Sequence, residues 1–98
     1  ENVKTNEEDE LKVDGVFIEI GYELKTDFVK ELVEVNKIGE IIVDDRCRTS
    51  LPGFFAAGDV TTVPFKQTII SAGEGAKAGL EAYRYLQGDR ANVSIDWK

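Results

Sequence analysis

The stretch from Thr49 to Glu74 limits the possible folds of this chain more than any other. It reads TSLPGFFAAGDVTTVPFKQTIISAGE. Residues 51–53, Leu-Pro-Gly, suit a tight turn, because proline pre-sets φ at the first central position and glycine accepts the positive φ of the next. Residues 54–57 form a continuous apolar run, which is too short for a helix and typical of a strand buried on both faces. We therefore predict a turn that leads into a short parallel strand.

The residues after this run have the chemistry of a ligand site. Gly58 leaves room for a ligand to approach the backbone, and Asp59 places a carboxylate just past the end of the predicted strand. Open α/β sheets bind nucleotides at that edge. A helix that begins near Gln67 would bring unpaired N–H groups and a partial positive charge to the same crevice. The stretch thus predicts a nucleotide-like ligand between Asp59 and the start of the helix.

Two linked motifs carry a resemblance to a known family. The first is T-S-x-P-G-x-F-A-A-G-D, and the second is K-Q-x-I-x-x-A-G-E-G-A-x-A. Together they resemble the C-terminal FAD-binding signature of the thioredoxin-reductase-like pyridine nucleotide-disulfide oxidoreductases, over about residues 13–86. The resemblance implies an α/β fold, namely part of a Rossmann-like FAD/NAD(P)-binding domain. Its elements would be β-hairpins, a short parallel strand and a long C-terminal helix.

The resemblance also implies which residues contact the cofactor. The backbone of residues 66–68 would meet the pyrimidine edge of the flavin, where reduction places negative charge, and the cation of Lys66 would lie beside it. Asp59 would hydrogen-bond the ribityl or pyrophosphate region. From the residues alone, the less favoured alternatives are a loop cap for Asp59 and a solvent-facing cation for Lys66. The full set that the resemblance assigns to FAD is Gly58, Asp59, Val60, Lys66, Gln67 and Thr68.

Several parts of such an enzyme are absent from the 98 residues. There is no G-x-G-x-x-G, no second nucleotide fingerprint and no C-x-x-C. The resemblance therefore implies the last third of a flavoprotein that passes electrons from NADPH or NADH through FAD to a thioredoxin- or peroxiredoxin-like protein disulfide. We expect it to be inactive without the N-terminal FAD/NAD(P)-binding part. Two alternatives remain open: a ferredoxin–NADP reductase of similar architecture, which an upstream C-x-x-C would exclude, and a noncatalytic binding or oligomerising fragment.

The whole chain is expected to form one C-terminal FAD-binding segment with three parts. Residues 1–21 would end the pyridine-nucleotide domain and provide a linker strand, as a β-hairpin around the acidic turn at 6–10. Residues 22–88 would complete the FAD domain. Residues 89–98 form a tail without a family counterpart, in which alternating apolar residues predict an edge strand or an extended segment.

The region between residues 22 and 50 has weaker patterns. Thr26 or Asp27 would cap a short helix that runs to about Leu32. A turn at 36–39 separates residues 33–35 from residues 40–43, which predicts a second hairpin.

A long helix over residues 67–87 is the strongest local prediction. Ser71 and Glu74 match a capping box, and Gly88 follows as the C′ residue. Three glycines within the helix indicate close approach of a strand or a flat ligand, since each costs about 1 kcal/mol of helix propensity relative to alanine. The predicted core-facing stripe consists of Ile69, Ala72, Ala76, Leu80 and Tyr83.

Composition excludes some classes of partner. The net charge of −7 argues against nucleic acid and anionic membranes, and no apolar run approaches the ~20 residues that span a bilayer. The single cysteine, Cys47, cannot form an internal disulfide, which favours a reducing, cytoplasmic setting. It lies between two arginines, so it is either a reactive thiol or a structural one, and a structural role is the expectation. Apolar surface without its covering half would make the chain a homo-oligomer.

Overall fold

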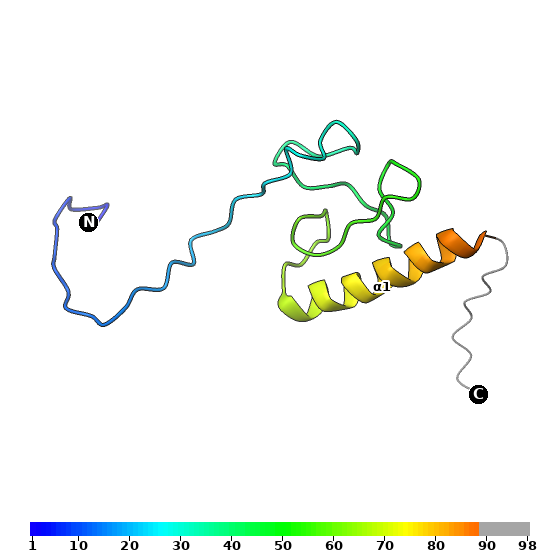
Figure 1. The fold of residues 1–98 in the computed structure, drawn as a ribbon. Helices are drawn as coiled ribbons and strands as arrows, with labels where there is room; N and C mark the ends of the chain where they lie inside the picture. Colours follow the sequence, from blue (N-terminus) through cyan, green and yellow to red (C-terminus); the bar gives the residue numbers. More distant parts are fainter. Residues whose placement is uncertain (89–98) are drawn as a thin grey trace.

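A computed structural model of the chain describes residues 1–88; the predicted strand of the tail lies outside the described residues. One helix, α1 (Thr68–Gln87), packs beside a set of loops formed by residues 22–67. Residues 1–21 extend away from these loops as a single thread (Figure 1). The radius of gyration is 19.7 Å, whereas a compact domain of this length has about 13 Å. The N-terminal arm accounts for this elongation.

The core is small and lies among the loops. Its buried apolar side chains are Val29, Val33 and Ile41, each 4% exposed. Ile41 forms an antiparallel bridge with Val35 and a parallel bridge with Thr61, so it joins the two halves of the loop region. Apolar side chains packed against this core are Val35, Val43, Phe54, Ala56 and Val60.

Helix α1 has the predicted bounds to within one residue. Gln67 is extended, with φ −125° and ψ 145°, and its carbonyl oxygen accepts the first helical hydrogen bond from the N–H of Ser71 at 2.9 Å. Gly88 ends the helix at φ 61°, and its N–H donates to the carbonyl oxygen of Tyr85. The predicted capping box is wrong, because Ser71 lies in the first turn and Gln67 occupies the cap position.

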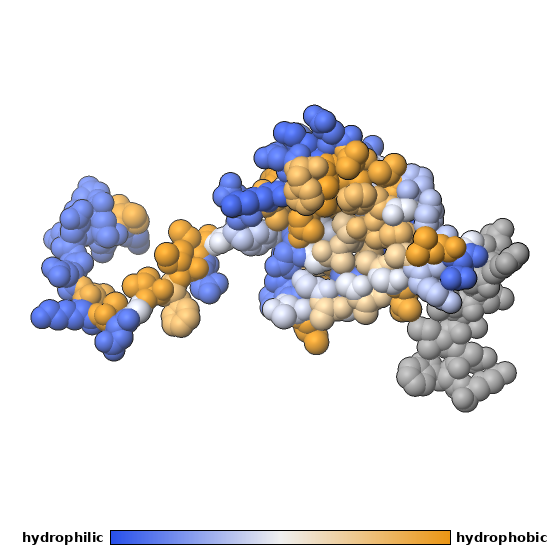
Figure 2. Space-filling view, in the orientation of Figure 1, coloured by the Kyte–Doolittle hydropathy of each residue, from blue (hydrophilic) through white to orange (hydrophobic). Residues whose placement is uncertain are grey.

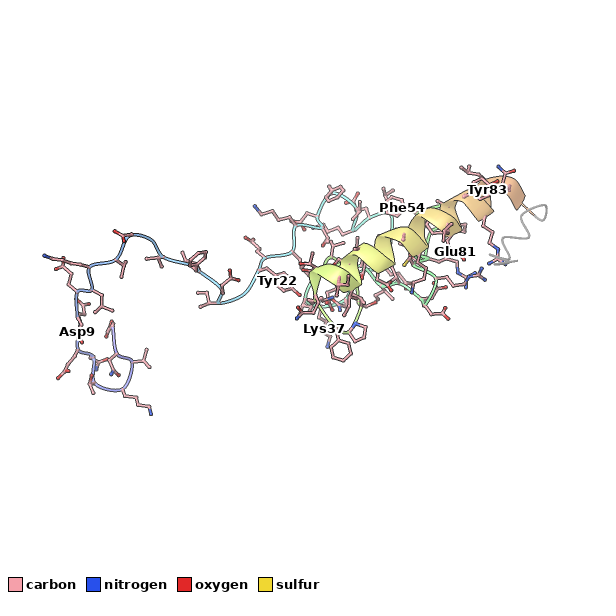
Figure 3. All side chains as sticks on the ribbon, turned by 90° about the horizontal axis from the view of Figure 1, so that it is seen from below. Asp9, Tyr22, Lys37, Phe54, Glu81 and Tyr83 are labelled. Atoms are coloured by element: carbon pink, nitrogen blue, oxygen red, sulfur yellow. The ribbon has the colours of Figure 1, made fainter. Side chains whose placement is uncertain are left out.

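The face of α1 that packs against the loops differs from the prediction. Ile69, Leu80 and Tyr83 of the predicted core-facing stripe are 81%, 45% and 54% exposed. The half-buried face contains instead charged residues such as Glu74 and Glu81, and Figure 3 shows Glu81 and Tyr83 on different sides of the helix. The loops offer hydrogen-bonding groups to α1, and these hold its polar face. The apolar stripe, named here the outer face of α1 (residues 69, 72, 76, 80 and 83), lies open.

The predicted short helix is also absent. Residues 27–33 form successive turns, in which Val29 and Lys30 donate their N–H groups to the carbonyl oxygen of Thr26. Thr26 does not cap a helix, because its buried hydroxyl donates to the carbonyl oxygen of Gly39 at 2.7 Å. This hydrogen bond joins the turns at 27–33 to the loop around Gly39. The Thr26 hydroxyl is therefore not available to cap a helix that starts after it.

The predicted hairpins and parallel strand are reduced to turns and single bridges. Residues 33–43 keep the turn, with the N–H of Asn36 bonded to the carbonyl oxygen of Glu40 at 2.9 Å, but the ladder is a single bridge. Residues 1–21 form only a turn at 2–7, so the first hairpin is wrong. Phe55 of the predicted parallel strand forms one antiparallel bridge, with Arg48. A strand needs a neighbour along its length, and the described residues supply none to these segments.

The turn at residues 51–53 forms as predicted. Phe54 donates its N–H to the carbonyl oxygen of Leu51 at 3.0 Å, and Gly53 has φ 84°. A Cβ atom on Gly53 would lie 3.0 Å from the ring of Tyr85, so glycine is required both for φ and for contact with the helix.

Much apolar surface is open to solvent. Figure 2 shows it on the N-terminal arm and over the loops. Within residues 1–88, no helix is both long enough and apolar enough to cross a bilayer. The most exposed large apolar side chains are Val3, Leu11, Phe17, Ile20, Phe28, Ile69 and Leu86, all at least 80% exposed.

We expect the isolated chain to self-associate through this surface. Sedimentation velocity should show a mean mass that rises with concentration above the mass of one chain. Exchange of Ile69 and Leu80 on the outer face for serine should shift the distribution toward the monomer, while Lys37→Ser, at an exposed polar site, should leave it unchanged. A compact monomer at every concentration would contradict the expectation.

Candidate functional site

The loop of residues 58–67 connects the apolar run at 54–57 to α1. Gly58 is buried, with φ 84°, and its carbonyl oxygen accepts two hydrogen bonds from Thr61: from the hydroxyl at 2.7 Å and from the N–H at 3.0 Å. Thr61 is fully buried. The loop is therefore closed tightly at its start, directly around Asp59.

Asp59 lies against the first turn of α1. The hydroxyl of Ser71 donates a hydrogen bond to its Oδ1 at 2.9 Å, and the carboxylate is otherwise exposed. A Cβ atom on Gly58 would lie 3.4 Å from the Ser71 oxygen, an ordinary contact, so glycine is favoured here by its φ of 84°. The predicted convergence of Asp59 and the helix start is confirmed. Ser71 was missed as a site residue, because its spacing to Glu74 matched a capping box.

Within residues 1–88, no side chain caps the N-terminus of α1. Gln67 makes no side-chain cap hydrogen bond, and the first turn contains no acidic residue. The N–H groups of Thr68, Ile69 and Ile70 have no carbonyl partner within the helix, as in the first turn of any α-helix. Gln67 and Thr68 are exposed. The partial positive charge of the helix end is thus available to an anionic group beside Asp59.

Lys66 and Val60 are turned toward the loops. The Lys66 Nζ is 2.7 Å from Oε2 of Glu40 and also donates to the carbonyl oxygen of Thr61. Lys66, and then Asn36, hydrogen-bond the Glu40 carboxylate and lower its pKa. The half-buried Val60 accepts a hydrogen bond from the N–H of Ile41 at 2.8 Å. The solvent-facing interpretation of Lys66 is therefore wrong, and of the six predicted residues Asp59, Gln67 and Thr68 form the exposed edge.

A polar cluster attaches the middle of α1 to the loop of residues 44–48. The Cys47 thiol donates to Oε2 of Glu74 at 3.1 Å, and the Lys77 Nζ is 2.8 Å from Oε1 of the same carboxylate. Further along the helix, Nη2 of Arg46 is 2.7 Å from Oε1 of Glu81. These contacts fix the direction of α1, and hence the position of its N-terminus.

Cys47 has the environment of a structural thiol. It is fully buried, at φ 60°, and burial followed by the hydrogen bond to Glu74 raises its pKa to about 11. The flanking arginines do not lower this pKa, because Arg46 pairs with Glu81 and Arg48 with Asp44. The expectation of a structural role is supported, and the interpretation as a reactive thiol is wrong.

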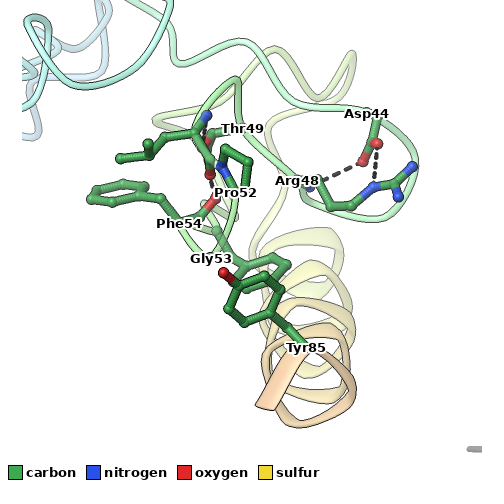
Figure 4. Close-up of a pocket in the computed structure, with 9 residues that line it drawn as sticks. Asp44, Arg48, Thr49, Pro52, Gly53, Phe54 and Tyr85 are labelled. Atoms are coloured by element: carbon green, nitrogen blue, oxygen red, sulfur yellow. Dashed lines mark hydrogen bonds and ion pairs between the residues drawn. The ribbon is translucent and has the colours of Figure 1, made fainter. Parts of the chain in front are cut away.

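Two cavities lie away from the exposed edge. One, of about 410 Å³, lies between the turn at 51–53 and Tyr85, whose ring packs edge-on against Phe55 at a centroid distance of 6.2 Å (Figure 4). The other, of about 250 Å³, lies between Val63 and Lys77. Within residues 1–88, no cluster of three or more His, Cys, Asp or Glu side chains has the arrangement of a metal site. The candidate site is therefore an open edge at the helix end.

Comparison with known proteins assigns the family. The model of the pyridine nucleotide-disulphide oxidoreductase family matches residues 1–93. The chain belongs to this family. The F component of the alkyl hydroperoxide reductase of Pseudomonas putida is 54% identical over 82 residues, which are 84% of this chain and 16% of the relative. The F component of the Escherichia coli K12 reductase is 51% identical over 76 residues, 78% of this chain and 15% of the relative.

Solved structures agree with this assignment. The thioredoxin reductase of Streptococcus pyogenes MGAS5005 superimposes with a TM-score of 0.70 and 44% identity, over 89% of this chain and 28% of that protein. The thioredoxin reductase of T. acidophilum superimposes with a TM-score of 0.70 and is 43% identical in sequence, over 87% of this chain and 28% of that protein. The predicted α/β, Rossmann-like fold class is supported. The chain spans about a sixth of the length of the curated relatives.

We expect Cys47 to resist alkylation in the folded protein. With a pKa of about 11, on the order of a thousandth of the thiol is ionised at pH 8. Mass spectrometry after treatment with iodoacetamide should show slow labelling that accelerates as the pH rises toward 11. The same chain unfolded in urea, with an ordinary thiol pKa, is the control and should label quickly. Complete labelling of the folded chain within the dead time at pH 8 would contradict the structural role.

Proposed function

We propose that this chain supplies the C-terminal part of the FAD-binding domain of a disulfide-reducing flavoprotein. The observation that carries the proposal is the contact between Asp59 and Ser71, which places a carboxylate beside the uncapped N-terminus of α1. Membership of the pyridine nucleotide-disulphide oxidoreductase family supports it. NADPH or NADH would be the reductant, and FAD the cofactor.

The residues present fit FAD by their chemistry. Asp59 is exposed and oriented by Ser71, so it can accept hydrogen bonds from ribityl hydroxyls. The N–H groups of residues 68–70 suit an acceptor-rich edge such as the pyrimidine edge of a flavin. When bound, FAD supplies the two-electron chemistry between a nicotinamide and a disulfide.

The chain's own contribution is electrostatic and positional. The end of α1 stabilises negative charge that develops at the cofactor edge, because its dipole is fixed before any charge appears. The polar cluster at Cys47 and Glu74 holds the helix direction, and the closed turn at Gly58–Thr61 holds Asp59. Within residues 1–88 no Cys pair is present, so the dithiol step belongs to another part of the enzyme.

The remaining part of the enzyme would cover the outer face of α1 and the N-terminal arm. Both carry exposed apolar side chains in this chain. A Cβ atom added at any of three helix glycines would meet no heavy atom within 4 Å: Gly73, Gly75 and Gly79. An N-terminal FAD/NAD(P)-binding part is the partner that the relatives' greater length supports. The electron acceptor would be a thioredoxin- or peroxiredoxin-like disulfide, in a cytoplasmic homo-oligomer.

A chimera tests the proposal. This chain replaces the matching segment of the Escherichia coli F component, and we expect the purified chimera to be yellow and to bind about one FAD. A noncatalytic binding fragment predicts a colourless protein that folds but takes up no FAD. Circular dichroism of a colourless product shows whether the chimera has folded without FAD, as a noncatalytic fragment predicts, or has simply misfolded.

Asp59→Asn in this chimera should weaken FAD binding about 10- to 100-fold, since hydrogen bonds to a charged group contribute about 1.5–3 kcal/mol. Fluorescence titration of the apo-chimera with FAD measures the change. Asp45→Asn is the matched control, because Asp45 is also an exposed aspartate but lies beside the middle of α1. Equal affinities for the two variants would remove Asp59 from the site.

A further inference from the structure

The ammonium group of Lys66 is turned inward although the residue lies just before the helix end. Its Nζ is 2.7 Å from Oε2 of Glu40 and donates a second hydrogen bond to the carbonyl oxygen of Thr61. The two side chains are only 19% and 14% exposed. Screening by water is weak at such a site, and loss of one partner leaves the other charge uncompensated.

Glu40 is held in place independently of Lys66. Its Oε1 accepts a hydrogen bond from Nδ2 of Asn36 at 2.8 Å, and its N–H donates to Oδ1 of the same side chain at 2.9 Å. The next residue, Ile41, is buried in the core and donates its N–H to Val60. The carboxylate is therefore a fixed acceptor, and it decides where the Lys66 side chain lies.

This arrangement connects both parts of the candidate site. The loop of residues 58–67 starts at Gly58 and Asp59 and ends at the first N–H groups of α1. Lys66 ties the end of the loop to the turn at 36–40, and the carbonyl group of Thr61 shares the same ammonium group. Thr61 in turn closes the start of the loop through Gly58. The ion pair is thus connected, through the ends of this loop, to both groups that would contact the cofactor.

We propose that Glu40 is a positioning residue for the flavin edge: it holds Lys66 against the loop and cancels its charge, so that Lys66 adds no net positive charge beside the end of α1. This inference rests on the proposed function. It predicts opposite electrostatic effects for the two partners. Loss of Glu40 leaves a cation near the site, which favours the reduced, more negative cofactor. Loss of Lys66 leaves an anion, which disfavours it.

The experiment measures the flavin midpoint potential in the chimera by equilibration with a redox dye. Glu40→Gln should shift the equilibrium toward reduced flavin on the order of fivefold, or about 20 mV upward for a two-electron couple. Lys66→Met should shift it downward by a similar factor. The double variant Glu40→Gln/Lys66→Met should return close to the starting potential, because both charges are gone.

Glu81→Gln is the matched control. Glu81 also forms a half-buried ion pair, with Arg46 at 2.7 Å, and its side chain is 16% exposed. It lies toward the C-terminal end of α1, away from the candidate site. This variant should leave the midpoint potential unchanged while it lowers stability in the same way as Glu40→Gln.

The outcomes separate this inference from the proposed function. A chimera that folds without taking up FAD contradicts the proposed function. If FAD binds, and Glu40→Gln and Lys66→Met shift the potential in the same direction or not at all, the positioning role is overturned. If Glu40→Gln loses FAD, the double variant decides: recovery of FAD supports the role of the pair, and continued loss overturns it.

Discussion

The pairing of Ile41 with Thr61 is the constraint on which the described structure depends. Ile41 donates its N–H to Val60 and accepts a hydrogen bond from the N–H of Thr62 at 3.0 Å, while its side chain fills the centre of the small core. These contacts join the turn at 36–40 to the loop at 58–67. Glu40, which precedes Ile41, and Asp59, which precedes Val60, are placed by the same pairing. Core and candidate site are therefore not separable in this chain.

Polar contacts attach α1 to the rest of the molecule, together with the ring contact between Tyr85 and Phe55. The helix has no fully buried residue, yet Cys47, Arg46 and the backbone of Asp45 all bond to its side chains. Half-buried ion pairs contribute little net stability but fix orientation, since each has a narrow range of favourable geometry. The outer face of α1 remains apolar and open. A helix oriented in this way suits a larger assembly, in which further apolar contacts would cover the outer face of α1.

Features that depend on a few neighbouring residues were predicted well. The bounds of α1, the turn at 51–53 and the end of the helix at Gly88, which is the C-cap and not the predicted C′ residue, follow from local periodicity and from the φ preferences of glycine and proline. The hairpins and the parallel strand were predicted less well. Apolar runs indicate strands only when another strand lies beside them, and such a neighbour comes from distant sequence. For the same reason, the prediction of which face of α1 packs against the loops was wrong. The spacing of apolar residues shows that one face of a helix is apolar, but it does not show which part of the protein covers that face.

The sequence by itself determined the family, the helix and the close relation of Asp59 to the helix start, because these depend on short motifs with fixed spacing. The tertiary structure alone decided the contacts of Ser71, Glu40 and Cys47. Each has a partner at least 12 residues away: Asp59 for Ser71, Lys66 for Glu40, and Glu74 for Cys47. Such partners are chosen by how the loops pack around Ile41, and no local pattern encodes that packing.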